Sequence, residues 1–471
     1  MNNYYDELLK LCGFDDNDIE SEKPRLDKAF QKIELGSEDM DRAVAFVKEY
    51  HDVELVGVRK LMRAWLLELV DMVLARDEGK KIVYFGYPSI SPGPGQAIKA
   101  AAPDKIYAGA PDVVLCNTLG QIFDMLGSIS EAGEENGLPP GHGLCSLLTV
   151  RVGGMAKGII PIPDLVIGAS YSCDMGSKAD ELLHEKYGHR AIYMDGSLDS
   201  AWGEYPEFLP ERVRFLGAQM DKVPDIVKEV IGVEITSEAW DRAMEVGRHF
   251  YRRLGQLTEL MASDPLPVGP TVQTLALHLM SGCTGRAMAD GPEAMDILIE
   301  EVKQRVDKGI GVVEKGAPRV LITLTHMSDP RIARMIEQAG LAAICSGHTA
   351  PPRLSTRKEK APEGFYTTLG ELRAETEMRD GRWHSSYATA IRTPEIIMAL
   401  KPDGVIASYL YCCRPAALGS HNYKIAAEKT GIPHLQLEVD LFDSRNYSAE
   451  ALRTRVETFA DMLRDRKAAA Q

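Results

Sequence analysis

Three cysteines that are far apart in the chain stand at the ends of apolar segments. Cys173 follows the run PDLVIGAS at 163–170, and Cys413 follows DGVIASYLY at 403–411. Cys145 stands directly ahead of a third apolar segment. Both runs are typical of short buried strands, and ligands bind beyond the carboxyl ends of parallel strands. The three thiols could therefore meet at one point, and deprotonated cysteines are the ligands of iron-sulfur clusters.

The spacing of these cysteines leaves other interpretations open. No C-x-x-C run is present, because Cys145 and Cys173 are 28 residues apart and Cys413 lies 240 residues further on. Spacing alone favours burial as small hydrophobic residues over ligation. Zinc ranks lower still, since no His or Cys lies nearby at finger-like spacing. Cys412 and Cys413 cannot both point the same way on an extended backbone, so we expect one to ligate and the other to pack.

The fold that must position these thiols is expected to be α/β. At 471 residues the chain is too long for one ordinary core. Alternating strands and helices predict two doubly wound parallel-sheet lobes, flavodoxin-like or Rossmann-like, at 81–204 and 319–471. A helical N-terminal cap at 1–80, with one long amphipathic segment from 37 to 75, and a mainly helical connector at 205–318 complete the expected organisation.

Two local patterns bear on the first lobe. The segment from Asp104 to Cys116 is expected to supply a strand at PDVVLCN (111–117), followed by a helix from Leu119 to Ile129. The loop from Tyr87 to Gly95 lacks the third glycine of a dinucleotide fingerprint, so nucleotide binding there is disfavoured. This loop and the region from Thr325 to Pro352 are expected to shape a substrate pocket.

Composition narrows the class of protein. The formal net charge of −15 argues against a nucleic-acid partner and against an anionic membrane surface. No apolar run reaches the roughly 20 residues that span a bilayer, and the first residues lack the features of a signal peptide. We expect a cytoplasmic protein without a membrane association. The other four cysteines are expected to be buried rather than paired in disulfides: Cys12, Cys116, Cys283 and Cys345.

Several segments resemble the benzoyl-CoA reductase and 2-hydroxyacyl-CoA dehydratase family over most of the chain after about residue 80. The most specific is GIPHLQLEVDLFDSRNYS at 431–448, followed by LRTRVETF at 452–459. The segment from Cys145 through Arg151 and Gly153 and the segment PIPDLVIG with Cys173 are similar to the regions of the first two cluster ligands in that family. Cys413, with the downstream Gly419, is similar to the third.

The resemblance implies a 4Fe-4S cluster that three cysteines hold, with one iron left open. Carried onto this chain, the ligands are Cys145, Cys173 and Cys413, with Cys412 as the substitute for Cys413. The resemblance also implies an acyl-CoA substrate that is reduced to a ketyl-type radical anion, a separate ATP-hydrolysing iron-sulfur activator, and a second homologous large subunit in a heterodimer or a homodimer. The chain contains no G-x-x-x-x-G-K-[ST] loop, which fits this division of labour.

The outcome of the implied reaction depends on groups near the acyl carbon. Loss of a hydroxyl would give dehydration, whereas uptake of a proton and a second electron into a ring would give dearomatisation. Arg151 and Arg414 lie beside thiols and could contact the cluster or the thioester oxygen, although a structural salt bridge explains each equally well. Four histidines expected in loops are candidate proton donors, with an ordinary surface role as the alternative for each: His142, His326, His348 and His421.

Two other functions remain open at this point. One is a related reductase of small molecules that holds a double-cubane cluster. The other is a cluster-free structural or assembly subunit. The sequence does not choose between dehydratase and reductase, between the two large subunits of the family, or among acyl groups.

Overall fold

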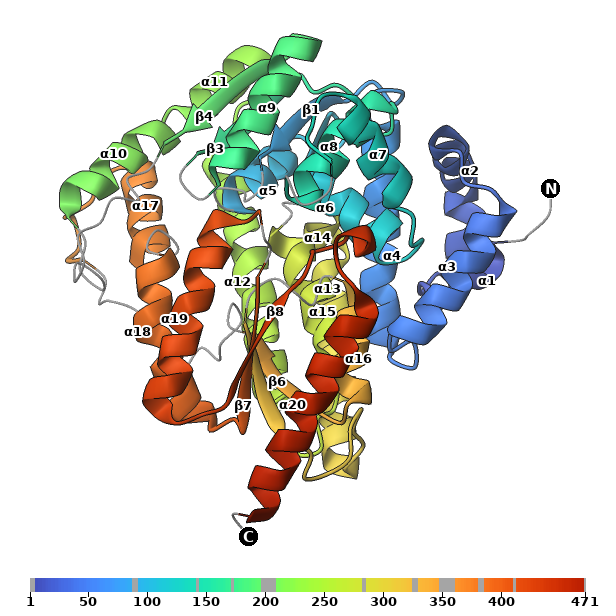
Figure 1. Cartoon of the computed structure of the whole chain (residues 1–471). Coiled ribbons are helices and arrows are strands. Elements are labelled where there is room, and N and C mark those ends of the chain that lie inside the picture. Colours follow the sequence, from blue (N-terminus) through green and yellow to red (C-terminus); the bar gives the residue numbers. More distant parts are fainter. Residues whose placement is uncertain are drawn as a thin grey trace.

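The computed structural model describes residues 5–86, 92–140, 144–170, 173–195, 209–281, 285–323, 329–346, 361–379, 385–409 and 412–469. Within these ranges, two sheets of four parallel strands are present (Figure 1). The strands of the first sheet are β1 (Lys81–Phe85), β2 (Ile106–Gly109), β3 (Leu165–Ala169) and β4 (Arg190–Met194). The strands of the second are β5 (Arg319–Thr323), β6 (Ala342–Ser346), β7 (Gly404–Tyr409) and β8 (His434–Glu438).

Both sheets have the same strand order. The first runs β2-β1-β3-β4 and the second runs β6-β5-β7-β8. In each sheet the strand order extends outward in opposite directions from the two central strands. The position between these two strands is the switch point of a doubly wound fold. The predicted α/β architecture with two parallel-sheet lobes is confirmed. We call each sheet with its covering helices the first and the second lobe.

Helices cover both faces of the first sheet. Ile82 and Tyr84 point to one face, whereas Val83 and Phe85 point to the other, as the two-residue period of a strand requires. The first face packs against α4 (Val56–Leu74), α6 (Pro111–Leu115), α8 (Ser146–Ala156) and α9 (Asp174–Tyr187). The second face is covered by α5 (Pro92–Ala101), α10 (Pro210–Met220) and α11 (Val223–Ile231).

The second sheet is sandwiched in the same way. Val320, Ile322 and Ile406 pack with α16 (Pro330–Gln338) and α20 (Ala449–Ala469). Leu321 and Val405 belong to the opposite face, which α13 (Pro270–Ser281), α18 (Ser385–Leu400) and α19 (Arg414–Thr430) cover. Each lobe is therefore a three-layer sandwich.

The N-terminal region differs from the predicted cap. The segment from 37 to 75 is two helices, α3 (Ser37–Tyr50) and α4, because the backbone is extended at His51. Helix α4 is buried on almost every side, as expected for a helix that is apolar all round, and it forms part of the core. Only α1 (Asp6–Leu11), α2 (Asp16–Ile33) and α3 lie at the side of the molecule (Figure 1).

The prediction of a strand at PDVVLCN was wrong. The strand β2 ends at Gly109, and Pro111 begins α6, which continues into the π-helix η1 (Cys116–Gly120). Proline is favoured at the first position of a helix, and a short apolar run does not distinguish a strand from a buried helix. The following helix is α7 (Gly127–Glu135), later than the predicted helix at 119–129.

The predicted connector is helical and contacts both lobes. In addition to α10, α11 and α13 it contains α12 (Ser237–Leu260), α14 (Gly285–Ala289) and α15 (Gly291–Lys308). Helix α12 packs on α5, and α13 contacts β6. Helix α17 (Leu369–Arg379), which lies between β6 and β7 in the sequence, packs on α10 beside the first sheet (Figure 1). Among the described helices, none combines the length and the apolar character needed to span a bilayer.

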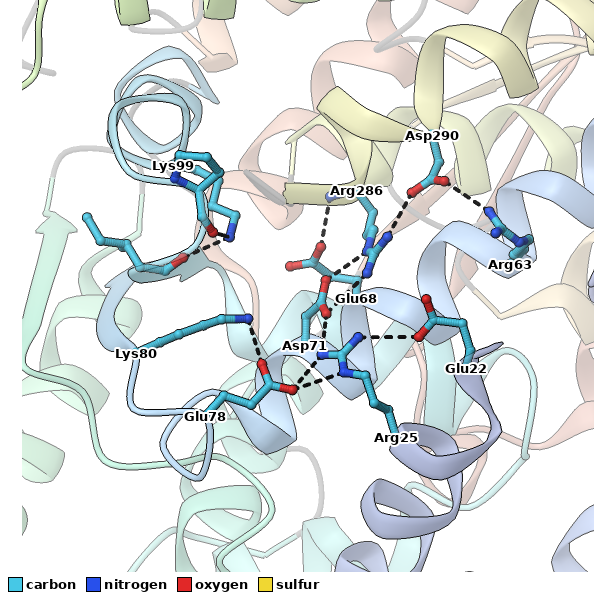
Figure 2. A network of polar contacts seen from close by, with 12 residues as sticks. Glu22, Arg25, Arg63, Glu68, Asp71, Glu78, Lys80, Lys99, Arg286 and Asp290 are labelled. Atoms are coloured by element: carbon cyan, nitrogen blue, oxygen red, sulfur yellow. Dashed lines mark hydrogen bonds and ion pairs between the residues drawn. The ribbon is translucent and has the colours of Figure 1, made fainter. Parts of the chain in front are cut away.

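A network of ion pairs joins the N-terminal helices to the connector (Figure 2). Asp71 of α4 accepts from Arg25 of α2 at 2.9 Å and from Arg286 of α14 at 2.7 Å. The neighbouring Glu68 is fully buried and accepts from the backbone N–H of Arg286 at 3.0 Å. These contacts fix α2, α4 and α14 as one unit next to the first sheet.

Candidate functional site

The three cysteines of the predicted site stand at the N-termini of three helices. Cys145 is the N-cap of α8, Cys173 is the N-cap of α9, and Cys413 is the N-cap of α19. The Sγ atom of Cys173 accepts from the backbone N–H of Gly176 at 3.4 Å. The N-terminal end of a helix favours a negative charge and stabilises a thiolate.

The positions relative to the strands agree with the sequence analysis for two of the three. Cys173 follows β3 and Cys413 follows β7, so each stands beyond the equivalent strand of its own sheet, next to the switch point. Cys145 does not follow a strand. Cys145 comes after α7, and the apolar segment that follows it is the helix α8.

The thiols of the two lobes share one electrostatic environment. Burial raises the pKa of Cys145 well above its usual range, and the charges of Cys412, Asp440 and Cys413 raise it further. Burial also raises the pKa of Cys412 to about 12, together with the charges of Asp440, Cys413 and Cys173. The structure therefore brings the first-lobe cysteines close enough to the second-lobe pair for their charges to interact.

The arrangement is open rather than a tight ligand set. Within the part of the chain that the structure describes, no three or more His, Cys, Asp and Glu side chains converge closely enough to hold a single metal ion. All four thiols are partly exposed. Thiolates that hold a polynuclear cluster stand farther apart than the ligands of one ion, because the irons and sulfides lie between them.

Asp440 is a buried carboxylate beside the thiols that the sequence analysis did not single out. Its Oδ1 atom accepts from the backbone N–H groups of Phe442 and Asp443, each at 3.0 Å. Its Oδ2 atom accepts from the side chain of Asn446 at 3.0 Å. These bonds fix the turn after β8, and the pattern D-x-x-D-x-x-N in the quoted segment was the signal that could have revealed it.

Arg151 forms a structural salt bridge, which was one of its two predicted roles. Its guanidinium is buried and is paired with Asp112 of α6 at 2.7 Å and with Asp180 of α9. Both partners are buried as well. The guanidinium thus joins the helix of Cys145 to the helix of Cys173. The side chain of Arg414 lies outside the described residues.

Helix α8 also packs very closely on α7. A Cβ atom on Gly153 would lie 1.8 Å from the carbonyl oxygen of Ile129. On the facing helix, a Cβ atom on Gly133 would lie 2.4 Å from the carbonyl oxygen of Thr149. Glycine is required at both positions because the two backbones touch.

The segment from 440 to 446, which follows β8, contacts α7 through Arg445. Arg445 forms ion pairs with Asp443 at 2.7 Å, with Glu134 at 3.1 Å and with Glu131 at 3.4 Å. Asp443 lies in the second lobe, whereas the two glutamates belong to α7. The segment from 440 to 446 therefore links the lobes directly beside the thiols.

Of the four predicted proton donors, only His421 lies within the described residues. His142, His326 and His348 lie outside the described residues, as do residues 87–91, 325–328 and 347–352 of the two segments expected to shape a substrate pocket. His421 was expected in a loop, but it lies inside α19 and its side chain is exposed. Cys12 and Cys116 are buried, as predicted, whereas Cys283 and the side chain of Cys345 lie outside the described part.

Comparison with known proteins identifies similar chains. The model of the family described as "2-hydroxyglutaryl-CoA dehydratase, D-component" matches residues 101–463, which include all four thiols. The alpha subunit of (R)-2-hydroxyglutaryl-CoA dehydratase from Acidaminococcus fermentans is 19% identical over 316 residues, which cover 64% of this chain and 61% of that one. The beta subunit of (R)-phenyllactyl-CoA dehydratase from Clostridium sporogenes is 21% identical over 257 residues, which cover 53% and 63%. The matches thus span about three fifths of the length of both relatives.

Proposed function

Because this chain belongs to the family of the 2-hydroxyglutaryl-CoA dehydratase D-component, we propose that it is the iron-sulfur subunit of a 2-hydroxyacyl-CoA dehydratase-type enzyme. The substrate class is an acyl-CoA thioester with a hydroxyl group on the carbon next to the carbonyl. Dehydration removes this hydroxyl and a proton from the neighbouring carbon, so the reaction has no net oxidant or reductant. The observation that supports the proposal is that cysteines of both lobes cap helices and that their charges interact.

We propose Cys145, Cys173 and Cys413 as the ligands of a 4Fe-4S cluster. When bound, such a cluster supplies low-potential single electrons and an iron with an open position. Two features support this ligand set: the thiols interact electrostatically, and each caps a helix. Helix dipoles at the three N-caps would stabilise the thiolates and the negative charge of the group that they hold.

The choice of Cys413 over Cys412 follows from the helix caps. Cys413 has the same place at the start of α19 that Cys145 and Cys173 have at the starts of α8 and α9. Cys412 lies one residue before the cap. Since it lacks the helix N-terminal position that the other three thiols share, we assign Cys412 the packing role.

The partners of the enzyme follow from the same family assignment. The two relatives are named as an alpha and a beta subunit of dehydratases, which supports a homologous large subunit as the partner of this chain. The chain has no P-loop motif, which supports a separate ATP-hydrolysing activator as the electron source. The site residues of the chain then bind and orient the cluster, while ATP hydrolysis occurs elsewhere.

The proposal is tested by iron and sulfide analysis after strictly anaerobic purification. We expect roughly four irons with acid-labile sulfide per chain. The variants Cys145→Ala, Cys173→Ala and Cys413→Ala should each lose iron and colour. Cys412→Ala should retain both, and Cys12→Ala, which changes a buried thiol far from the site in sequence, is the control for unspecific loss.

Two outcomes would contradict the proposal. Metal-free wild-type protein under anaerobic conditions would remove the cluster, and loss of iron in Cys412→Ala but not in Cys413→Ala would exchange the third ligand. The reaction type is tested with a panel of 2-hydroxyacyl and aryl thioesters, a strong reductant and the isolated complex. Conversion of aryl thioesters alone would point to a dearomatising reductase instead.

A further inference from the structure

Arg151 is the centre of a buried group of three charges that belongs to three helices. The guanidinium comes from the middle of α8, and its two amino groups pair with Asp112 of α6 and Asp180 of α9. Exposures are 3% for Arg151, 0% for Asp112 and 3% for Asp180. Two carboxylates around one guanidinium, shielded from bulk water, require a fixed geometry, because charge-assisted hydrogen bonds depend strongly on direction.

Among the residues that the structure describes, the surroundings of Arg151 leave no room for an acyl-CoA. The cavity that it lines together with Asp180 and His189 has a volume of about 10 Å³. A space of this size accommodates about one water molecule. Arg151 therefore cannot touch the thioester in this conformation, and any role in the reaction must pass through the elements that it holds.

Asp180 is seated at the carboxyl edge of the first sheet. A Cβ atom on Gly86, just beyond β1, would lie 2.8 Å from its Oδ2 atom, and one on Gly168 of β3 would lie 3.4 Å from it. The two central strands thus leave space for this carboxylate at the switch point of the sheet. Through Asp180, the helix that begins at Cys173 is held against both the sheet and α8.

We propose that Arg151 and Asp180 are positioning residues that set the mutual orientation of Cys145 and Cys173, and so the geometry of the cluster. The inference rests on the proposed function, since it assigns residues that act through the cluster ligands. Arg151 lies two turns of α8 away from Cys145, and Asp180 lies two turns of α9 away from Cys173. A rotation of either helix would therefore move its N-terminal thiol, and the salt bridge resists that rotation.

The two aspartates provide a matched pair of variants. Asp112→Asn and Asp180→Asn each remove one of the two negative charges that pair with the buried Arg151. Their effects on the free energy of unfolding should therefore be similar. Only Asp180 lies on a helix that begins at a proposed cluster ligand. The metal-free variants are compared by urea unfolding, and the reconstituted proteins by iron retention, midpoint potential and the electron paramagnetic resonance spectrum of the reduced cluster.

Asp180→Asn is expected to retain the cluster about tenfold less tightly than the wild type and to change its spectrum and potential, as for outer partners of other metal ligands. Asp112→Asn should retain the wild-type spectrum and potential at a comparable loss of stability. Equal changes of the cluster in both variants, or wild-type spectra in both, would overturn the positioning role.

A measurement without the cluster separates this inference from the proposed function. Hydrogen exchange of the metal-free proteins should show faster exchange at the first turn of α9 in Asp180→Asn but not in Asp112→Asn. Unchanged protection of α9 in Asp180→Asn would overturn the inference. Absence of iron in the wild type would overturn the proposed function, while the exchange result would still decide whether Asp180 orients α9.

Discussion

A cysteine is an unusual N-cap, because side-chain oxygens of Ser, Thr, Asp and Asn accept from the first helical N–H groups far better than sulfur does. The site nevertheless places Cys145, Cys173 and Cys413 at this position. Each helix would be more stable with an oxygen at its cap, so the choice of sulfur fits a chemical role. Proline near the start of α19, just after Cys413, indicates this helix start in the sequence.

Glu68 shows how a single buried carboxylate should govern the pH dependence of stability. Burial raises its pKa from 4.5 to about 7, the nearby charge of Asp71 adds to this, and the backbone N–H of Arg286 acts in the opposite direction. Between pH 4.5 and about pH 7 the folded state therefore binds more protons than the unfolded state. The free energy of unfolding should therefore fall as pH rises through this window, by roughly 3 kcal/mol for this group.

The change Glu68→Gln should remove this slope and stabilise the protein above pH 7, since the amide oxygen still accepts from Arg286. The measurement is urea unfolding from pH 5 to pH 8. Glu78→Gln in the same network (Figure 2) is the control: hydrogen bonds from Lys80 and Arg25 outweigh burial and lower the pKa of Glu78 below 4.5. This variant should therefore keep the wild-type slope between pH 5 and pH 8. The same slope in Glu68→Gln and in the wild type would contradict the assignment.

At the level of elements, α8 is fixed on three sides. Arg151 joins it to α6 and α9, and Gly153 brings it into backbone contact with α7. Helix α7 is in turn held by Arg445 of the second lobe. The position of Cys145 at the start of α8 is thus determined by contacts with both lobes rather than by its own loop.

Gly153→Ala is expected to destabilise the protein by about 1–3 kcal/mol or more, because the new methyl group overlaps the carbonyl oxygen of Ile129 and forces the helices apart. Gly247→Ala in α12 is the matched control, since a Cβ atom there meets nothing within 4 Å. It should raise stability by about 0.5–1 kcal/mol through better helix propensity. Equal unfolding midpoints in urea for the two variants would show that α7 and α8 are not in contact.

At the level of the whole molecule, the two lobes share one core. A continuous set of buried side chains includes Trp65 of α4, Tyr84 of β1, Leu275 of α13 and Val405 of β7. The indole N–H of Trp65 donates to the carbonyl oxygen of Leu275 at 3.2 Å. Helix α17 is a further connection between the lobes, because it follows β6 of the second sheet but packs on α10 of the first lobe.

We therefore expect the lobes to unfold in a single cooperative transition. Differential scanning calorimetry of the metal-free protein should give one peak, with a calorimetric enthalpy close to the van't Hoff value. Limited proteolysis should accordingly yield no stable fragment of either lobe. Two resolved peaks, or a persistent fragment near 81–204 or 319–471, would show that the shared core does not couple the lobes.

The sequence by itself determined the α/β class and the strands that precede Cys173 and Cys413, because the composition and periodicity of strands are local features. Tertiary structure alone decided that α4 is a core helix, that PDVVL is helical, that Cys145 caps a helix, and that Arg151 lies between two aspartates. These outcomes depend on burial and on charges that come from distant positions in the chain. A short apolar run or a single arginine has no local pattern that reveals which partners will surround it.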